Sequence, residues 1–591
     1  MLTVSTPSPL RGTPPFQEES FRFRKYMMEL RTKIAMFATV CLLLSQAIAA
    51  NRLLPQGSPP AKTLDVADIA GQSADLRLAA ITLQGLVNRG NESSIYYIAE
   101  KNCNDMVWLE QMVEEKAVGS YQNIGIDELF KKYGDVYSTV VIYDDKLPST
   151  INVAMMIGSI DDGIAISALD VERFGKGKKV VDLRGKWHSN VQAYQWAVVN
   201  LLPKMNKDVL ACFHPNYIPH NIRDYLVAHK IFTFWITSEE KQDGITSSFE
   251  DEKTFAVKLF RKYKPNTPVL GFWYSGEDCG INEYPGVGLA GEYGLLSLPC
   301  DWSTNLSVHS GITVDWEPVV KKYRQTRLAD KPVLDKSKIY ICFSIIESGD
   351  APVYWQNGQY MVWSDKKAGQ IPINWSVGPA TMELMPLIMK WYYDRMAPKD
   401  HFFIGLSGAG YVHPYRNLFG KTHDPEKAWK DYLALTDDYM KTYGIDHISL
   451  YTDAWMEFDR SKKDSITSLF ADNLSTVQMI MMGMGRDEGM TAVKANYTVG
   501  KKNVLVSHVM TRWNAAGRMQ PCEENIQWLV DEIKKQSPES KPGFMMVHPL
   551  SWAYYASDLI EVANRLGTDY EVIGLTAYQQ LVNEAGYVNQ K

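Results

Sequence analysis

Three carboxyl residues could catalyse a reaction, because each directly follows a short apolar run. Glu347 and Asp350 come after the run 339–345, and Asp453 comes after the run 447–451. Cleavage of a glycosidic bond uses two carboxyl groups, one protonated as the general acid and one ionised as the base or nucleophile. We therefore predict Asp350 and Asp453 as the catalytic pair, with Glu347 as the alternate.

Side chains suited to sugar binding follow other apolar runs of the same region. Aromatic rings offer large faces that can stack on sugar rings, and His and Arg can bond hydroxyl groups. The chain has 16 Trp and 32 Tyr, more than we expect a core alone to need. We predict that Trp375, Tyr411, Trp455 and Trp513 form a stacking floor, and that His413, Arg512 and His548 bond sugar hydroxyls.

Each of these positions also has a purely structural interpretation. Glu347 and Asp350 flank Gly349 as in a capped turn. Asp453 suits the N-cap of a following helix, and His548 suits a hydrogen-bonded interior position.

Two other functions stay open beside a glycosidase. A metal-assisted hydrolase or deacetylase would use Asp350, His508 and His548 around an activated water, although no H-x-x-x-H or H-E-x-x-H spacing supports it. A non-catalytic glycan-binding protein would use the aromatic residues alone. We expect no metal and no cofactor.

The stretch His401–Arg416, HFFIGLSGAGYVHPYR, joins an apolar run to a loop rich in glycine. Gly408 and Gly410 allow positive φ or close backbone approach, and Pro414 disfavours helix at the residue before it. A dinucleotide fingerprint is excluded, because its third glycine would fall at His413. We predict a rigid loop displaying Ser407, Tyr411 and His413; a tight strand-to-helix connection without chemistry is the alternative.

The heptapeptide GAGYVHP, residues 408–414, resembles the signature of the GxGYxYP family. His413 stands where the family signature has tyrosine. The family consists of exported proteins that carry the label "putative glycoside hydrolase". The resemblance extends over most of the mature chain, places the motif in a C-terminal domain, and implies activity on carbohydrate.

The region after residue 338 predicts a (β/α) barrel. Seven or eight βα units over about 250 residues match such a barrel in number and size. The fold class we predict is α/β, with a C-terminal barrel-like domain of seven or eight strands after smaller α/β N-terminal domains. The expected strands are Ile339–Ile345, Ile373–Val377, Phe402–Leu406, His447–Tyr451, Val477–Met482, Val504–Val509, Phe544–Val547 and Tyr570–Gly574. The helices expected between them include Met382–Tyr393, Glu426–Thr442 and Asn525–Lys535.

The N-terminal half alternates short strands with amphipathic helices, which favours parallel α/β layering. We expect a proline-rich leader at 52–62 within a first α/β domain at 52–205. A second α/β domain follows at 206–330, and the barrel-like domain occupies 335–591. The acidic loop 275–278 is expected to be a solvated turn.

The first 50 residues indicate export. Arg31 and Lys33 precede an apolar run that ends at the small-x-small site 47–49, as in a signal peptide, and residues 1–26 suggest an extended start. We expect a periplasmic or extracellular protein without stable membrane insertion after cleavage. The net charge of -6 argues against nucleic acid, so carbohydrate is the expected partner. The six cysteines outside this segment are expected to be mostly buried thiols.

Overall fold

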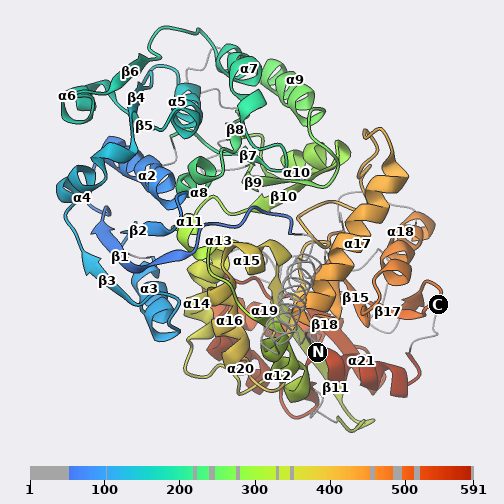
Figure 1. Cartoon of the computed structure of the whole chain (residues 1–591). Coiled ribbons are helices and arrows are strands. Elements are labelled where there is room, and N and C mark those ends of the chain that lie inside the picture. The colour runs from blue at the N-terminus through green and yellow to red at the C-terminus, as the bar shows by residue number, and fades with distance from the viewer. Residues whose placement is uncertain are drawn as a thin grey trace, which may run out of the picture. The chain divides into compact units, whose positions relative to one another are not determined.

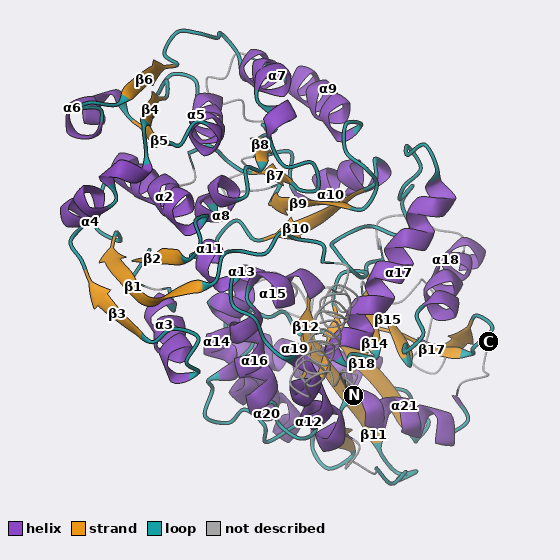
Figure 2. Cartoon of the chain, in the orientation of Figure 1, coloured by secondary structure: helices purple, strands orange, loops and turns teal. Residues whose placement is uncertain are grey.

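Four sheets with helices between their strands make up this α/β chain (Figures 1 and 2). The computed structural model describes residues 52–101, 103–216, 222–237, 247–273, 280–327, 332–345, 352–452, 460–483, 495–510 and 520–587. The described residues from Leu53 onward belong to one compact unit. No helix among the described residues is long and apolar enough to cross a membrane.

The region 52–205 contains two parallel three-stranded sheets. The first has the order β2-β1-β3 and the second the order β5-β4-β6. Their strands are β1 (Pro60–Asp68), β2 (Ser93–Ile98), β3 (Ser120–Asn123), β4 (Thr139–Ile142), β5 (Gly163–Ile166) and β6 (Lys179–Asp182). The accompanying helices are α2 (Ala74–Asn88), α3 (Asp105–Glu114), α4 (Ile126–Lys132), α5 (Ser149–Ile160), α6 (Val171–Phe174) and α7 (Asn190–Asn200).

Strand β1 corrects the expectation of a leader at 52–62, because the strand begins at Pro60 and is the centre of its sheet. Leu64 and Val66 are buried in one apolar cluster, and Ala67 is buried in another. A central strand buries both faces, so its side chains enter two cores. Proline is tolerated here because it is the first residue of the strand.

Helix α2 packs against β5 and α8 (Arg223–Ala228) and so connects the first three sheets. Ser73 caps it by accepting a hydrogen bond from the Leu76 amide. A Cβ atom at Gly85 would lie 2.5 Å from the Asp224 carbonyl oxygen. The crossing of α2 and α8 therefore requires glycine at this position.

The third sheet is parallel and has the order β10-β9-β7-β8, so β10 is an edge strand. Its strands are β7 (Leu210–Cys212), β8 (Phe232–Phe234), β9 (Thr267–Gly271) and β10 (Leu295–Pro299). Helices α9 (Phe249–Phe260) and α10 (Glu283–Glu292) precede β9 and β10, and α11 (Leu306–His309) and α12 (Trp316–Arg327) follow. Among the described strands, β9 is the only one paired with β10.

The C-terminal region contains a curled nine-stranded sheet of order β16-β17-β15-β14-β13-β12-β11-β18, with β19 also paired to β11. Every pair in it is parallel except β16 with β17. A bridge between Val509 and Met546 connects the end of β17 to β18, so the sheet curls back on itself. Its strands are β11 (Ile339–Ile345), β12 (Asn374–Val377), β13 (His401–Ile404), β14 (His447–Leu450), β15 (Met479–Met482), β16 (Asn496–Val499), β17 (Val504–His508), β18 (Gly543–Val547) and β19 (Tyr570–Val572).

Each of the eight expected strands of this region is present, and β16 is an additional one. The expected helix Met382–Tyr393 is instead two helices, α15 (Pro379–Leu384) and α16 (Pro386–Arg395). Pro386 separates them because it disfavours helical backbone at Met385, whose φ is -141°. The other helices are α13 (Pro352–Gln356), α14 (Gly358–Trp363), α17 (Pro425–Tyr443), α18 (Arg460–Asn473), α19 (Glu523–Gln536), α20 (Ala556–Leu566) and α21 (Leu575–Glu584).

The cysteines agree with the expectation of free thiols where the structure describes them. No disulfide joins any two of the described cysteines, which are Cys103, Cys212, Cys300, Cys342 and Cys522. Three of these five thiols are buried, and Cys103 and Cys522 are partly buried.

Candidate active site

A strained turn follows β13 and directs the motif loop. Leu406, Ser407 and Gly408 have φ values of 42°, 85° and 133° in succession. Hydrogen bonds hold this backbone: the Ser407 amide donates to the Ser449 carbonyl at 2.9 Å, and the Tyr432 hydroxyl donates to the Ser407 carbonyl at 2.7 Å. The Ser407 hydroxyl accepts from the Tyr451 amide at 2.9 Å and is buried, so it supports the turn.

The two motif glycines allow the loop to pack closely against its neighbours. A Cβ atom at Gly408 would lie 2.6 Å from the Tyr432 hydroxyl, and one at Gly410 would lie 2.8 Å from Cβ of Leu296. Tyr411 then pairs with Ser297 on the outer edge of β10: its amide donates to the Ser297 carbonyl at 2.9 Å. The motif loop therefore joins the curled sheet to the third sheet.

Tyr411 also contacts a carboxyl group on α10, the helix that precedes β10. Its hydroxyl donates to Oε1 of Glu283, the first residue of α10, at 2.8 Å. Burial raises the pKa of the half-buried Glu283, and the hydrogen bond from Tyr411 partly opposes this increase. The motif tyrosine thus positions a carboxyl group whose protonated form is favoured by its surroundings.

His413 lies between two tyrosine rings. Its ring centroid is 4.7 Å from that of Tyr451 and 4.7 Å from that of Tyr284. The Arg416 guanidinium lies over the Tyr284 ring, 4.2 Å from the centroid. Burial, with a contribution from the Arg416 charge, lowers the pKa of His413 to about 3. This histidine is neutral at ordinary pH and packs as an aromatic ring.

Trp375 is not available to a sugar, contrary to the prediction. Its side chain is 1% exposed, packs against Trp363 at 4.7 Å between ring centroids, and donates to the Asp400 carboxylate at 3.1 Å. The neighbouring Asn374 contacts a different part of the structure, because its side-chain amide donates to the Phe343 carbonyl. Side chains alternate along a strand, so Trp375 faces the helical layer.

Tyr411 and His413 also differ from their predicted roles, because each is only 3% exposed. Their rings are enclosed at the junction of the two sheets and do not form an open stacking floor. His548 is buried too, with its ring stacked at 6.3 Å on Phe403. His508 lies 3.1 Å from the Tyr497 hydroxyl through Nε2, as an interior histidine would.

Six of the predicted site residues lie outside the described residues. They follow the carboxyl ends of β11, β14 and β17 in the sequence and comprise Glu347, Asp350, Asp453, Trp455, Arg512 and Trp513. The acidic loop 275–278, which follows β9 in the sequence, is also outside the described residues. Within the described ranges, no group of three His, Cys, Asp or Glu side chains could hold a metal ion.

Two carboxyl residues near the junction were missed by sequence reasoning. Glu283 begins a helix, a position where acidic residues are common for structural reasons. Asp301 follows the apolar run 295–298, so the strand-end rule applied to the C-terminal region would have found it. Carboxyl groups at the carboxyl ends of the third sheet's strands are therefore further candidates for the site.

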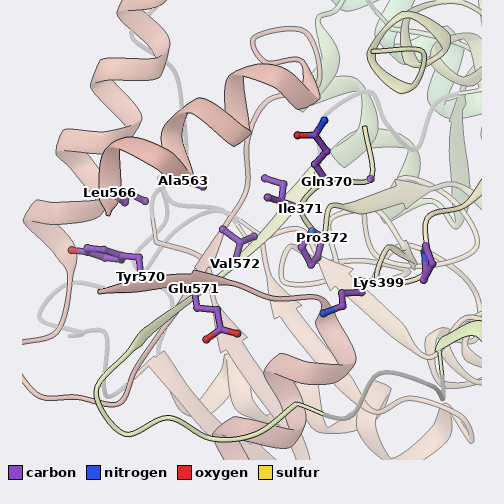
Figure 3. A pocket seen from close by; sticks show the side chains of 11 residues that line it. Gln370, Ile371, Pro372, Lys399, Ala563, Leu566, Tyr570, Glu571 and Val572 are labelled. Atoms are coloured by element: carbon purple, nitrogen blue, oxygen red, sulfur yellow. The ribbon is translucent and has the colours of Figure 1, made fainter. Parts of the chain in front are cut away.

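A groove of about 510 Å³ lies at the opposite end of the curled sheet (Figure 3). Gly369–Pro372 and Pro398–Lys399 line it just before β12 and β13 begin, and β19 and α20 complete it. In (β/α) barrels the chemistry occurs at the carboxyl ends of the strands. We therefore place the candidate site at the motif loop and not in this groove.

The amino-acid sequence of the chain matches four family models. The first, second and third domains of GxGYxYP match residues 63–135, 137–205 and 207–311, and the "GxGYxYP putative glycoside hydrolase C-terminal domain" matches 337–583. The chain belongs to the GxGYxYP family. The resemblance carried by residues 408–414 is thereby confirmed, and the GxGYxYP motif is the loop that pairs with β10.

A solved structure shares the fold of this GxGYxYP protein. It is described as "Crystal structure of a putative hydrolase from Bacteroides thetaiotaomicron VPI-5482", with a TM-score of 0.73 and 19% sequence identity. The match covers 90% of this chain and 96% of that one. A comparison with curated proteins found no match.

Proposed function

We propose that this GxGYxYP protein is an exported glycoside hydrolase that cleaves a poly- or oligosaccharide. The curled sheet would act as an irregular (β/α) barrel, with the substrate at the carboxyl ends of its strands. Asp350 and Asp453, with Glu347 as the alternate, would supply the carboxylates after β11 and β14. Trp455 and Trp513 would stack on the sugar, and Arg512 would bond its hydroxyls.

The observation that carries this proposal is the hydrogen bond between Tyr411 and Glu283. Glycoside hydrolysis requires carboxyl groups in different protonation states, and burial produces such a difference. Glu283 is a carboxyl group of raised pKa that accepts a hydrogen bond from the family's motif tyrosine, Tyr411, whose ring centroid lies 5.6 Å from that of Tyr451. Asp453 follows Tyr451 by two residues in the sequence.

The proposal predicts loss of turnover when a carboxylate is neutralised. The secreted protein, whose N-terminal residue should be Ala50 or Asn51, is assayed on a panel of polysaccharides. Asp350→Asn or Asp453→Asn should reduce kcat by about 10²–10⁴-fold and leave ligand affinity nearly unchanged, because proton transfer acts on the transition state. Glu571→Gln, which changes a carboxylate in the groove at the opposite end of the sheet, is the matched control.

Other outcomes would assign the protein to a different class. Full activity of both Asn variants would exclude the two carboxylates as catalytic groups. Activity abolished by a chelator and restored by zinc would indicate the metal-assisted hydrolase. Saccharide binding without cleavage by the unmodified protein would indicate a glycan-binding protein.

A further inference from the structure

The groove at the amino end of the curled sheet's strands has an apolar lining (Figure 3). Its volume of about 510 Å³ lies within the range of about 300–1,000 Å³ that is typical of small-molecule sites. Pro372 and Leu566 are buried in its lining, whereas the side chains of Ile371, Ala563 and Val572 are only partly buried. A ligand in the groove would therefore remove apolar surface from water, which favours binding.

Strand β19 adds an aromatic side chain to this lining. Side chains alternate along a strand, so Tyr570 and Val572 lie on one face of β19 and Glu571 lies on the other. Figure 3 shows Val572 directed toward α20 and Ile371, and Glu571 directed away from them. The Tyr570 hydroxyl shares a hydrogen bond of 2.9 Å with the Ser537 hydroxyl, which fixes the orientation of its partly buried ring.

The backbone of β19 brings hydrogen-bonding groups to the same groove. The strand bonds β11 through the carbonyl of Asp569 and the amide of Ile573, each at 2.9 Å. Backbone groups of successive residues point to opposite edges of a strand, so the carbonyl of Tyr570 and the amide of Val572 point away from β11. None of the described residues that line the groove belongs to β11, so these groups lie on the edge of β19 that borders the groove.

Hydrogen bonds hold the walls of the groove. The Asp365 carboxylate accepts from the amide and the hydroxyl of Ser557 at 3.0 and 2.6 Å, and so ties the turn before the segment 369–372 to the start of α20. The Asp400 carboxylate accepts from the Ile373 amide at 3.0 Å, which holds the other end of that segment beside the start of β13. A groove with fixed walls loses little conformational entropy when a ligand binds.

This combination of groups fits a sugar better than a purely apolar ligand. A sugar ring has C–H groups on its faces and hydroxyls around its edge, so it needs an apolar or aromatic surface with hydrogen-bonding groups beside it. Tyr570 and Val572 provide the surface, and the exposed Gln370 amide at the rim adds to the backbone groups of β19 (Figure 3). An acyl chain would instead cover those backbone groups without bonding them, which is unfavourable.

We infer that this groove is a second, non-catalytic binding site for saccharide; the choice of sugar as the ligand class rests on the proposed function. A polysaccharide held in the groove would stay close to the opposite end of the same sheet, where the motif loop lies. Such tethering raises the effective concentration of the polymer at a second site without any new contact there. The curled sheet would thus hold a polymer at one end and cleave it at the other.

Electrophoresis of the secreted protein in native gels tests this binding directly. Separate gels contain soluble starch, xylan, pectin or glucomannan, and the dependence of mobility on polysaccharide concentration gives Kd. The unmodified protein should be retarded in at least one gel. Ala563→Phe should raise that Kd by about 10-fold or more, because the added ring occupies the volume that the ligand needs. Gln370→Ala should raise it by about 2–10-fold through loss of a hydrogen bond to the ligand.

Glu571→Gln is the matched control, because its carboxylate is directed away from α20 and its Kd should stay that of the unmodified protein. Equal Kd values for Ala563→Phe, Gln370→Ala and the unmodified protein would overturn the inference, as would retardation in no gel. If thermal melting shows that Ala563→Phe does not fold, Gln370→Ala decides, since its side chain is exposed.

Hydrolysis of the same four polysaccharides, measured as released reducing ends, separates this inference from the proposed function. Cleavage together with equal Kd values would overturn the groove site and leave the proposed function in place. Retardation that the two groove variants weaken, without cleavage of any polysaccharide, would support the groove site while the proposed function fails.

Discussion

At the scale of single residues, the contact between Tyr411 and Glu283 couples stability to pH. The folded-state pKa of Glu283 is raised by burial, so the folded chain retains a proton that the unfolded chain loses above about pH 4.3. Between that pH and the folded pKa the folded state binds more protons, and its stability falls as the pH rises. The Tyr411 hydroxyl limits this loss because it stabilises the ionised carboxylate.

Tyr411→Phe should therefore destabilise the protein more at pH 7 than at pH 4. At pH 7 the variant leaves a half-buried carboxylate without its donor, at a cost of about 1–3 kcal/mol. At pH 4 the carboxyl group is mostly protonated in both proteins, and the difference should be smaller. Thermal unfolding at the two pH values measures the difference between the variant and the unmodified protein.

Tyr432→Phe is the matched control for this pH dependence. Its buried hydroxyl donates to a neutral acceptor, the Ser407 carbonyl, at 2.7 Å. Removal of this donor should destabilise the protein by a similar amount at both pH values. Equal pH profiles for the two variants would contradict the role assigned to Glu283.

At the scale of elements, the motif loop depends on close backbone packing against β10. Gly410→Ala would place a methyl group 2.8 Å from Cβ of Leu296, too close for either backbone to remain in place. We expect the bridge between Tyr411 and Ser297 to weaken, with a loss of about 1–3 kcal/mol in the free energy of unfolding. Denaturant unfolding measures this loss.

Gly125→Ala is the control, because it is the same substitution at a position without a close contact. Gly125 precedes α4 with a φ of -69°, which alanine adopts, and no atom lies within 4 Å of the added Cβ. This change should be neutral or stabilise the protein by up to about 1 kcal/mol. A Gly410→Ala variant as stable as the control would show that the loop does not need its close contact.

At the scale of the whole molecule, contacts join the C-terminal region to the N-terminal sheets at several points. The Glu383 carboxylate accepts from the Leu54 amide at 2.8 Å, and the Gln356 carbonyl accepts from the Trp108 indole at 2.7 Å. One apolar cluster includes both Trp108 and residues of the curled sheet. The C-terminal region is therefore packed against the N-terminal sheets through polar and apolar contacts alike.

A fragment of residues 335–591 should therefore be less stable than the chain from residue 53. Loss of the N-terminal sheets exposes apolar surface and leaves Glu383 without its amide donors. We expect its melting temperature to fall by about 10 °C or more, since each kcal/mol lowers it by about 2–4 °C in a domain of this size. A cooperative melt of the fragment at the temperature of the longer chain would contradict this expectation.

The sequence by itself determined the local elements of this protein. Apolar runs bounded by turn residues located all eight expected strands of the C-terminal region, because burial of a strand depends on its own side chains. Residues 408–414 also identified the family. Pro386 could have predicted from the sequence that α15 and α16 are separate helices, although the helical spacing around it favoured one helix.

Only the tertiary structure decided which side chains meet. Trp375 follows the expected pattern for a site residue, yet the alternation of β12 turns it into the helical layer. Tyr411 meets Glu283, 128 positions away in the sequence, because the motif loop pairs with the edge of β10. Such contacts depend on how one sheet packs against another, and the local pattern of apolar and polar residues does not predict that packing. The raised pKa of Asp301 likewise results from burial that its neighbours in sequence do not reveal.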